Sequence, residues 1–493
     1  MRRNNAQGRM RLWLLSGALG AVLVAGPAPA QMIAPLPPVA AGPVTPPPAS
    51  GPLTLDEVLE ASRQHQPQIL EALARVRVAE GRRLSVEGAF DTLFAASADT
   101  RLSGFYDGRY LESKITQPLQ TNGGNVYGSY RVSGGRFPTY ENEKFTNELG
   151  EFKVGAVFAL LRDRIIDERR FGRTLAEGEI ELADAERLMI AIGVQARAIE
   201  AYNAWVVAGQ RLRIFRDLLA LAQERQRGFQ RAVAEGLRPR IILTENEQNI
   251  LRRQSFVTQA EQALAVAANN LSLFWRNADG RPMLADVARL PDALPAPLPL
   301  PVDPRSGLVQ RPDLRNLELR LSLARERLAL DRNQLLPRLD VAVEVSRDIG
   351  EIGAGGRSFD GTESKLGLTL RVPLQNRAAR GRLMQTEAEI DAFRRRGQAL
   401  GEQIVAQIDA ISIAIGASAR IAGLASDEAD RASAMAAAER RRFDMGATDF
   451  FVVNLREEAA ADAQIRRIDA LARQIQAHAD MAAATADATV LKL

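Results

Sequence analysis

Two long seams of apolar residues dominate the pattern along the chain. Steps of three and four residues from Ala191 to Val233 meet apolar side chains everywhere except Gln226. The same steps from Gly401 to Phe443 meet mainly apolar or small side chains. A seam sustained over about six heptads is typical of a coiled coil.

A glycine follows each seam, Gly236 after the first and Gly446 after the second. Glycine adopts the left-handed conformation that ends many helices, so each seam should turn there and return as another helix. We therefore expect long helices at about 164–235 and 238–276, and again at about 377–445 and 448–486. The 56 residues from Ile180 to Gly236 alone would form a rod of roughly 84 Å.

Strict alternation of apolar and polar residues marks other segments as strands. The segment from Leu339 to Ser346 has leucine and valines in its odd positions, with Asp340 and Glu344 among the even ones. Such a period of two gives a strand one apolar face and one polar face. We expect strands at about 338–347 and 364–373, at 150–160, and, on a weaker pattern, at 91–104.

These segments recur in the same order, which predicts an internal duplication. Pro67 and Pro312 open similar helices 245 residues apart, whereas Gly236 and Gly446 are 210 residues apart. The 35-residue difference places an insertion at about 101–145, where Gly, Tyr, Ser and Asn are frequent. We interpret the insertion as an enlarged loop with room for extra strand.

The N-terminal segment resembles an export signal. Four arginines precede an apolar run, and Ala28-Pro29-Ala30 offers a small-residue cleavage site. The organisation predicted is a signal peptide at 1–30, a Pro-rich linker at 31–52, a first structural repeat at 53–300 and a second at 301–493. Thr54 should cap the first helix through the backbone at Glu57.

Composition argues against catalysis. The chain has no cysteine and only His65 and His478, which lie in unrelated segments, and it has none of the common nucleotide, hydrolase or zinc-protease motifs. We therefore expect no enzyme activity, no catalytic residue, no cofactor and no metal. The 64 basic and 60 acidic residues are interspersed, whereas a nucleic-acid binder would gather its positive charge in one patch.

The predicted strands need partners. Segments of 8 to 10 residues with one apolar face suit tilted transmembrane strands, although a soluble antiparallel sheet would also alternate. Four strands cannot close a barrel, because the smallest membrane barrels use about 8 and open edges are not tolerated in lipid. The chain should therefore form oligomers.

The order of elements resembles the TolC-like outer-membrane efflux and export channels. The resemblance covers Leu53 to about Ala486, and its local marks are the two proline-containing helix openings, the strand-to-helix junction at 372–377 and the segment around the second turn at 442–457. It implies a mainly α fold with a membrane β-barrel portion, namely a homotrimer with a 12-stranded barrel continued by an α-helical coiled-coil tunnel. It also implies an outer-membrane location with the helical part in the periplasm.

The same resemblance implies function and partners. The chain would be a passive conduit in a tripartite efflux or type I secretion system, working with a periplasmic adaptor and an inner-membrane transporter. The tip turns at Gly236 and Gly446 are candidate docking points for the adaptor.

A gate is expected near the second tip, with Phe443, Asp449, Arg456 and Glu457 as candidates. Alanine at Asp449 or Arg456 should then raise conductance, although ordinary surface charges would explain these residues equally well. The main alternative for the whole chain is a periplasmic adaptor or coiled-coil scaffold, which would also join helical hairpins to β-structure.

Overall fold

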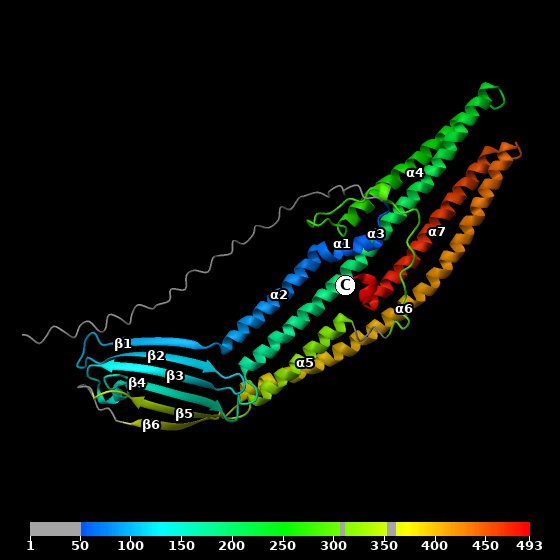
Figure 1. The fold of residues 1–493 in the computed structure, drawn as a ribbon. Coiled ribbons are helices and arrows are strands. Elements are labelled where there is room, and N and C mark those ends of the chain that lie inside the picture. Colours follow the sequence, from blue (N-terminus) through cyan, green and yellow to red (C-terminus); the bar gives the residue numbers. More distant parts are fainter. Residues whose placement is uncertain (1–50, 306–310, 353–360) are drawn as a thin grey trace, which may run out of the picture. The chain divides into compact units, whose positions relative to one another are not determined.

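The computed structural model describes residues 51–305, 311–352 and 361–493. The predicted signal peptide at 1–30 and all but the last two residues of the predicted linker at 31–52 lie outside these ranges. The helices, shown in Figure 1, are α1 (Leu55–His65), α2 (Pro67–Glu87), α3 (Glu168–Ala234), α4 (Ile241–Ser272), α5 (Pro312–Asn333), α6 (Arg377–Asp444), α7 (Phe450–Ala484) and α8 (Ala488–Leu491).

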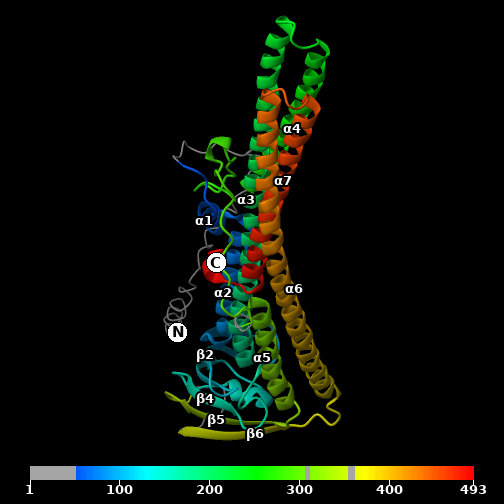
Figure 2. The same cartoon turned by 90° about the vertical axis from the view of Figure 1, so that its right-hand side faces the viewer.

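The long helices form two hairpins. Helix α3 packs along α4 and α6 packs along α7, while α3 also contacts α7 and so joins the hairpins. With 67 residues, α3 is about 100 Å long. Figure 2 shows the turn between α3 and α4 lying beyond the turn between α6 and α7.

The heptad seams form the buried faces of α3 and α6. Trp205, Ala222 and Phe229 are buried along the first seam, and Ile404 and Ile408 along the second. Burial of one apolar stripe in this way holds very long helices together, since helical propensity alone does not. The coiled-coil pattern therefore identified the packed faces as well as the helices.

Helix α1 docks on α3 at the start of the described region. Thr54 accepts a hydrogen bond from the Glu57 backbone N–H at 3.2 Å, so the predicted cap is confirmed. The Tyr202 hydroxyl on α3 donates to the Leu53 carbonyl at 2.8 Å. Burial raises the pKa of Tyr202 to about 12, so the hydroxyl remains protonated and can donate at any ordinary pH.

The described strands form one antiparallel sheet in the order β1-β2-β3-β4-β5-β6. Their bounds are β1 (Leu93–Thr100), β2 (Arg109–Pro118), β3 (Asn125–Gly134), β4 (Glu151–Ala159), β5 (Arg338–Asp348) and β6 (Thr362–Arg371). Four strands were expected, and that number was wrong. The insertion at 101–145 contains β2 and β3, which pair with each other and with their neighbours.

One face of the sheet is apolar and the other is polar. Val343 of β5 lies opposite Ala156 of β4 and Leu366 of β6, whereas the next residue, Glu344, lies opposite Gly155 and Lys365. Directly opposed residues of antiparallel strands share a face, so this register separates the two kinds of side chain across strands. Both outermost strands, β1 and β6, are exposed along their entire length.

Candidate gate and docking site at the helical tips

The two predicted tip glycines have the same local geometry. Gly236 has φ +74° and Gly446 has φ +76°, both in the left-handed region. At the first tip the Leu237 N–H donates to the Ala232 carbonyl at 2.8 Å, and at the second the Ala447 N–H donates to the Arg442 carbonyl at 2.8 Å. These six-to-one bonds are Schellman motifs, in which glycine avoids the strain that a side chain would bring.

Asp449 begins helix α7. Its carboxylate accepts a hydrogen bond from the Val452 backbone N–H at 2.9 Å, and this satisfies one of the free donors at the helix N-terminus. The structure thus gives Asp449 a capping role, and this role by itself accounts for an acidic residue immediately before α7.

Three phenylalanines join the tips of the two hairpins. Phe229 on α3 lies 6.1 Å from the ring of Phe443 on α6 and 5.5 Å from the ring of Phe450 on α7, in both cases edge to face. Phe229 is buried. The aromatic position predicted at the gate, Phe443, therefore packs against the first hairpin by ring contact and needs no hydroxyl to do so.

A buried charge cluster lies next to these rings. The Glu457 carboxylate on α7 is 2.5 Å from Arg225 of α3, 3.1 Å from Arg253 of α4 and 3.5 Å from Arg440 of α6. The side chains of Glu457 and Arg253 are each 1% exposed. One carboxylate thus meets a cation from each of the other three long helices.

Amide side chains extend this cluster between α4 and α7. The Asn454 side-chain oxygen accepts hydrogen bonds from Asn249 at 2.6 Å and from Arg253 at 2.7 Å. Arg253 also donates to the backbone carbonyl of Leu218 at 2.6 Å. Together, these residues form a polar layer through the interior of the joined hairpins.

Positive charge exceeds negative charge in this layer. Burial lowers the pKa of Arg253 from its ordinary value, although nearby Glu457 acts in the opposite direction. The Nη1 of Arg225 and the Nε of Arg253 are buried and have no hydrogen-bond partner among the described residues. Because unpaired buried cations are costly, the contact between the hairpins depends strongly on the single carboxylate of Glu457.

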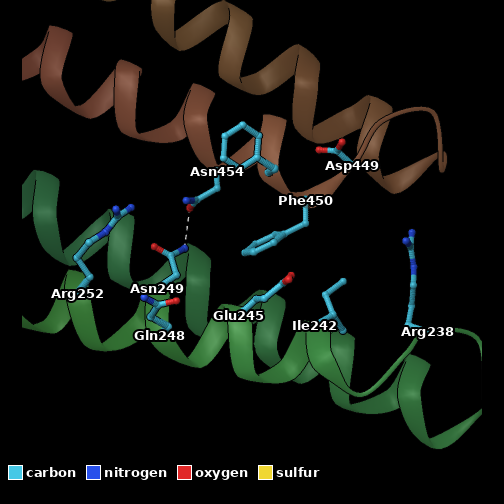
Figure 3. Close-up of a pocket in the computed structure, with 10 residues that line it drawn as sticks. Arg238, Ile242, Glu245, Gln248, Asn249, Arg252, Asp449, Phe450 and Asn454 are labelled. Atoms are coloured by element: carbon cyan, nitrogen blue, oxygen red, sulfur yellow. Dashed lines mark hydrogen bonds between the residues drawn. The ribbon is translucent and has the colours of Figure 1, made fainter.

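An open pocket of about 490 Å³ lies between α4 and α7 near the tips. Figure 3 shows Asn249 and Asn454, two of its lining residues, joined by a hydrogen bond, with Arg238 and Asp449 at the end nearest the turns. Seven of its ten lining residues are polar or charged, and Ile242, Phe450 and Phe451 supply apolar surface. It is therefore a gap between two hairpin tips with mixed chemistry.

The predicted gate residues have different roles in the structure. Phe443 and Glu457 contact the other hairpin, whereas Asp449 caps its own helix. Arg456 is half-buried and forms no ion pair within the described part of the chain. The sequence reasoning missed the partners of Glu457, namely Arg225, Arg253 and Arg440. Gln226, the one polar position in the first seam, was the available signal, because it hydrogen-bonds to Asn246 in the same layer at 2.8 Å.

Among the described residues, no group of three or more His, Asp or Glu side chains is placed to hold a metal ion. The chemistry available at the tips is therefore that of ion pairs, amide hydrogen bonds and aromatic packing. Such contacts can hold two hairpins together or release them.

The arrangement of one antiparallel sheet and two long helical hairpins is similar to the fold of several solved outer-membrane proteins. Similar solved structures include the outer-membrane channel OprN, at 17% identity and a TM-score of 0.59, covering 88% of this chain and 89% of that chain. VceC from Vibrio cholerae matches at 14% identity and a TM-score of 0.61, covering 88% and 96%. The CmeC channel of Campylobacter jejuni matches at 12% identity and a TM-score of 0.60, covering 88% and 85%.

The family comparison is more specific about the second part of the chain. Residues 304–487 match the model of the outer membrane efflux protein family. No curated protein matches the chain. The solved structures that share this fold are described as an outer-membrane channel and an outer membrane protein, and the location expected for this chain stays a prediction.

Proposed function

We propose that the chain is one subunit of a homotrimeric channel that crosses the outer membrane and the periplasm. It serves as the passive conduit of a tripartite efflux or type I secretion system, together with a periplasmic adaptor and an inner-membrane transporter. The observation that carries this proposal is the sheet, which has an apolar face and two unpaired edges and continues directly into the helical hairpins.

The sheet supports a barrel shared between chains. Six strands are fewer than the roughly 8 of the smallest membrane barrels, and lipid offers no hydrogen bonds to open edges. Strands β1 and β6 run in opposite directions, since the six-stranded sheet is antiparallel throughout. The β6 edge of one copy can therefore pair in antiparallel fashion with the β1 edge of the next.

The surface of α6 supports the same assembly. This helix contains an 18-residue stretch with a mean hydropathy of 1.5, long and apolar enough to cross a membrane by these criteria alone. Ile413 and Leu424 are 74% and 70% exposed in the single chain. In the proposed trimer, neighbouring subunits cover this surface, whereas in an isolated periplasmic adaptor it would face water.

At the tips, the proposed gate consists of the contacts between hairpins. Glu457 and the phenylalanines hold the α6–α7 hairpin against the α3–α4 hairpin in the closed state. Loss of these contacts would let the α6–α7 hairpin move outward and widen the mouth. The turns at Gly236 and Gly446 remain the proposed docking points for the adaptor.

The test is expression of the full chain in a Gram-negative host, followed by membrane fractionation, mass measurement in detergent and recording in planar bilayers. We expect a trimer in the outer-membrane fraction that forms discrete channels. A soluble or monomeric product, or a membrane protein without conductance even when Glu457 is replaced, would refute the proposal. Genetic complementation with either an efflux or a type I secretion partner set would then distinguish the two export roles.

A further inference from the structure

We propose that the barrel of this channel has 18 strands, six from each of three chains, because the β2–β3 hairpin is part of the barrel wall. This inference rests on the proposed trimeric function. It differs from the 12 strands that four strands per chain would give, and two strands of each chain would have to leave the wall to restore that number.

Hydrogen-bond register is the first argument. Strand β2 pairs with β1 from Leu93↔Thr116 to Thr100↔Arg109, and β3 pairs with β4 from Asn125↔Val157 to Arg131↔Glu151. The sheet is therefore continuous from β1 to β6. Because the insertion adds an even number of strands, β4 runs in the same direction as it would without them. It therefore still ends on the side where α3 begins.

The two faces of the sheet continue through the inserted hairpin. Leu111 lies opposite Val132, and Val126 lies opposite Ala156, on the same face as Val343. The alternate positions hold Glu112, Lys114, Ser129 and Arg131, which lie on the polar face. A hairpin that lay outside the wall would have no need for a lipid-compatible face of this kind.

Charged side chains link the inserted strands to the rest of the polar face. Arg131 of β3 is 3.1 Å from Glu112 of β2 and 3.8 Å from Glu151 of β4. The Tyr127 hydroxyl of β3 donates to Glu344 of β5 at 2.6 Å, and Lys153 of β4 is 3.3 Å from the same glutamate. Removal of β3 from the wall would break this network at several points.

The ends of the hairpin are also fixed. At the β2–β3 turn, Arg169 donates to the Gly123 carbonyl at 3.3 Å and Arg170 donates to the Thr121 carbonyl at 3.1 Å, both from the first turn of α3. At the opposite end, the Ser133 N–H donates to the Thr146 hydroxyl at 2.9 Å. The hairpin is thus tied to the helices at one end and to the β3–β4 loop at the other.

The consequence is a wider pore through the outer membrane. Barrel diameter increases roughly linearly with strand number, so 18 strands give about 1.5 times the diameter of 12. The polar face that lines this pore carries both signs of charge.

Paired cysteines test the strand order, since the chain has no cysteine of its own. The variants are Ala96→Cys with Ser113→Cys, which joins β1 to β2, and Val126→Cys with Ala156→Cys, which joins β3 to β4. Directly opposed residues are close enough for a disulfide, whereas β1 and β4 are three strands apart, about 14 Å. The matched control is Ala96→Cys with Ala156→Cys.

We expect both neighbouring pairs to oxidise in the membrane-inserted trimer and the control pair to remain reduced. Cross-linking of the control pair, or none of the three, in a stable trimer would overturn the 18-stranded barrel and leave the proposed function intact. A product that is not a membrane trimer would instead refute the proposed function.

Single labels provide a second measurement that does not depend on disulfide geometry. Spin labels at Leu111→Cys and Val132→Cys should contact lipid-soluble oxygen, and a label at Ser129→Cys should contact a water-soluble relaxation agent. Labels at all three positions that report only water would place the hairpin outside the wall and overturn the inference.

Discussion

Arg253 and Glu457 lie on different helical hairpins, yet each side chain is 1% exposed and their charged groups are 3.1 Å apart. Such a pair is costly to bury and contributes little net stability compared with apolar residues. The pair can instead make the joined and the separated hairpins similar in free energy, because separation of the hairpins would let water reach both charges. A contact of this type suits a gate that must close and also open.

Replacement of Glu457 by glutamine should weaken closure. The variant leaves Arg225 and Arg253 buried without a counter-charge, and loss of one partner of a buried pair typically costs about 3–5 kcal/mol. We therefore expect higher single-channel conductance, or more frequent open events, in planar bilayers. Faster hydrogen exchange in α7 near Asn454 should accompany the change.

Glu458→Gln is the matched control for this experiment. Glu458 is the next residue on α7 and forms a partly exposed ion pair with Arg252, and such surface pairs contribute about 0–1 kcal/mol. Equal conductance changes in the two variants would show that general tip charge is responsible, and the assignment of Glu457 as the closing residue would then be wrong.

Asp449 offers a way to separate charge from helix capping. Asp449→Ala removes the side-chain bond to the Val452 N–H and should destabilise the start of α7 by about 1 kcal/mol. Asp449→Asn keeps a capping oxygen and removes the charge. If conductance rises in the alanine variant alone, the cap contributes to closure. A rise in both variants would instead show that the charge of Asp449 contributes to closure.

Arg456→Ala tests the basic residue among the candidate gate residues and can be compared with Glu457→Gln. This arginine has no ion pair within the described chain, so the structure predicts a smaller effect than that of Glu457→Gln. A rise in conductance as large as that of the Glu457 variant would indicate a partner on a neighbouring subunit.

The tip glycines can be tested for docking separately from folding. A Cβ at Gly446 would meet no atom within 4 Å, but its φ of +76° strains most side chains, by about 1–2 kcal/mol. Asparagine tolerates this conformation and valine does not. We expect Gly446→Asn to keep the turn, as measured by hydrogen exchange, and Gly446→Val to lose it.

Export in cells then reports on docking. If the adaptor binds the tips by their shape, the double variant Gly236→Asn with Gly446→Asn should reduce export of substrate by a partner system. The trimer should remain as stable as the unmodified one. Full export by this double variant and by the corresponding valine variant would show that the adaptor does not dock at these turns.

Sequence reasoning succeeded where a pattern had one physical cause. The seam from Ala191 to Val233 had to be buried because it is apolar at helical spacing, and the segment expected at about 377–445 is helix Arg377–Asp444. Gly236 and Gly446 were recognisable because helix ends that turn sharply favour glycine. In each case local sequence and tertiary contact required the same structure.

The inserted strands were missed because small and polar residues interrupt their alternation of apolar and polar positions. In β2 the apolar face holds Leu111 and Ile115 but also Ser113 and Gln117, and in β3 it includes Gly128. Glycine and serine made the segment resemble a loop. The pairing of Arg131 with Glu112, which would have revealed two neighbouring strands, depends on register and cannot be recognised from either strand alone.

The division of the sheet into lipid and lumen faces can be tested at two adjacent residues. Val343 lies on the apolar face and Ala342 on the polar face of β5, both in the middle of the strand. Arginine near the midplane on the lipid side costs about 2–4 kcal/mol, whereas lumen positions tolerate charge. Val343→Arg should therefore reduce the yield of heat-resistant trimer in the outer membrane, and Ala342→Arg should assemble normally with altered ion selectivity. Normal assembly of Val343→Arg together with failure of Ala342→Arg would mean that the polar face points outward. Charged side chains would then face lipid, and this result would refute the barrel proposed for this chain.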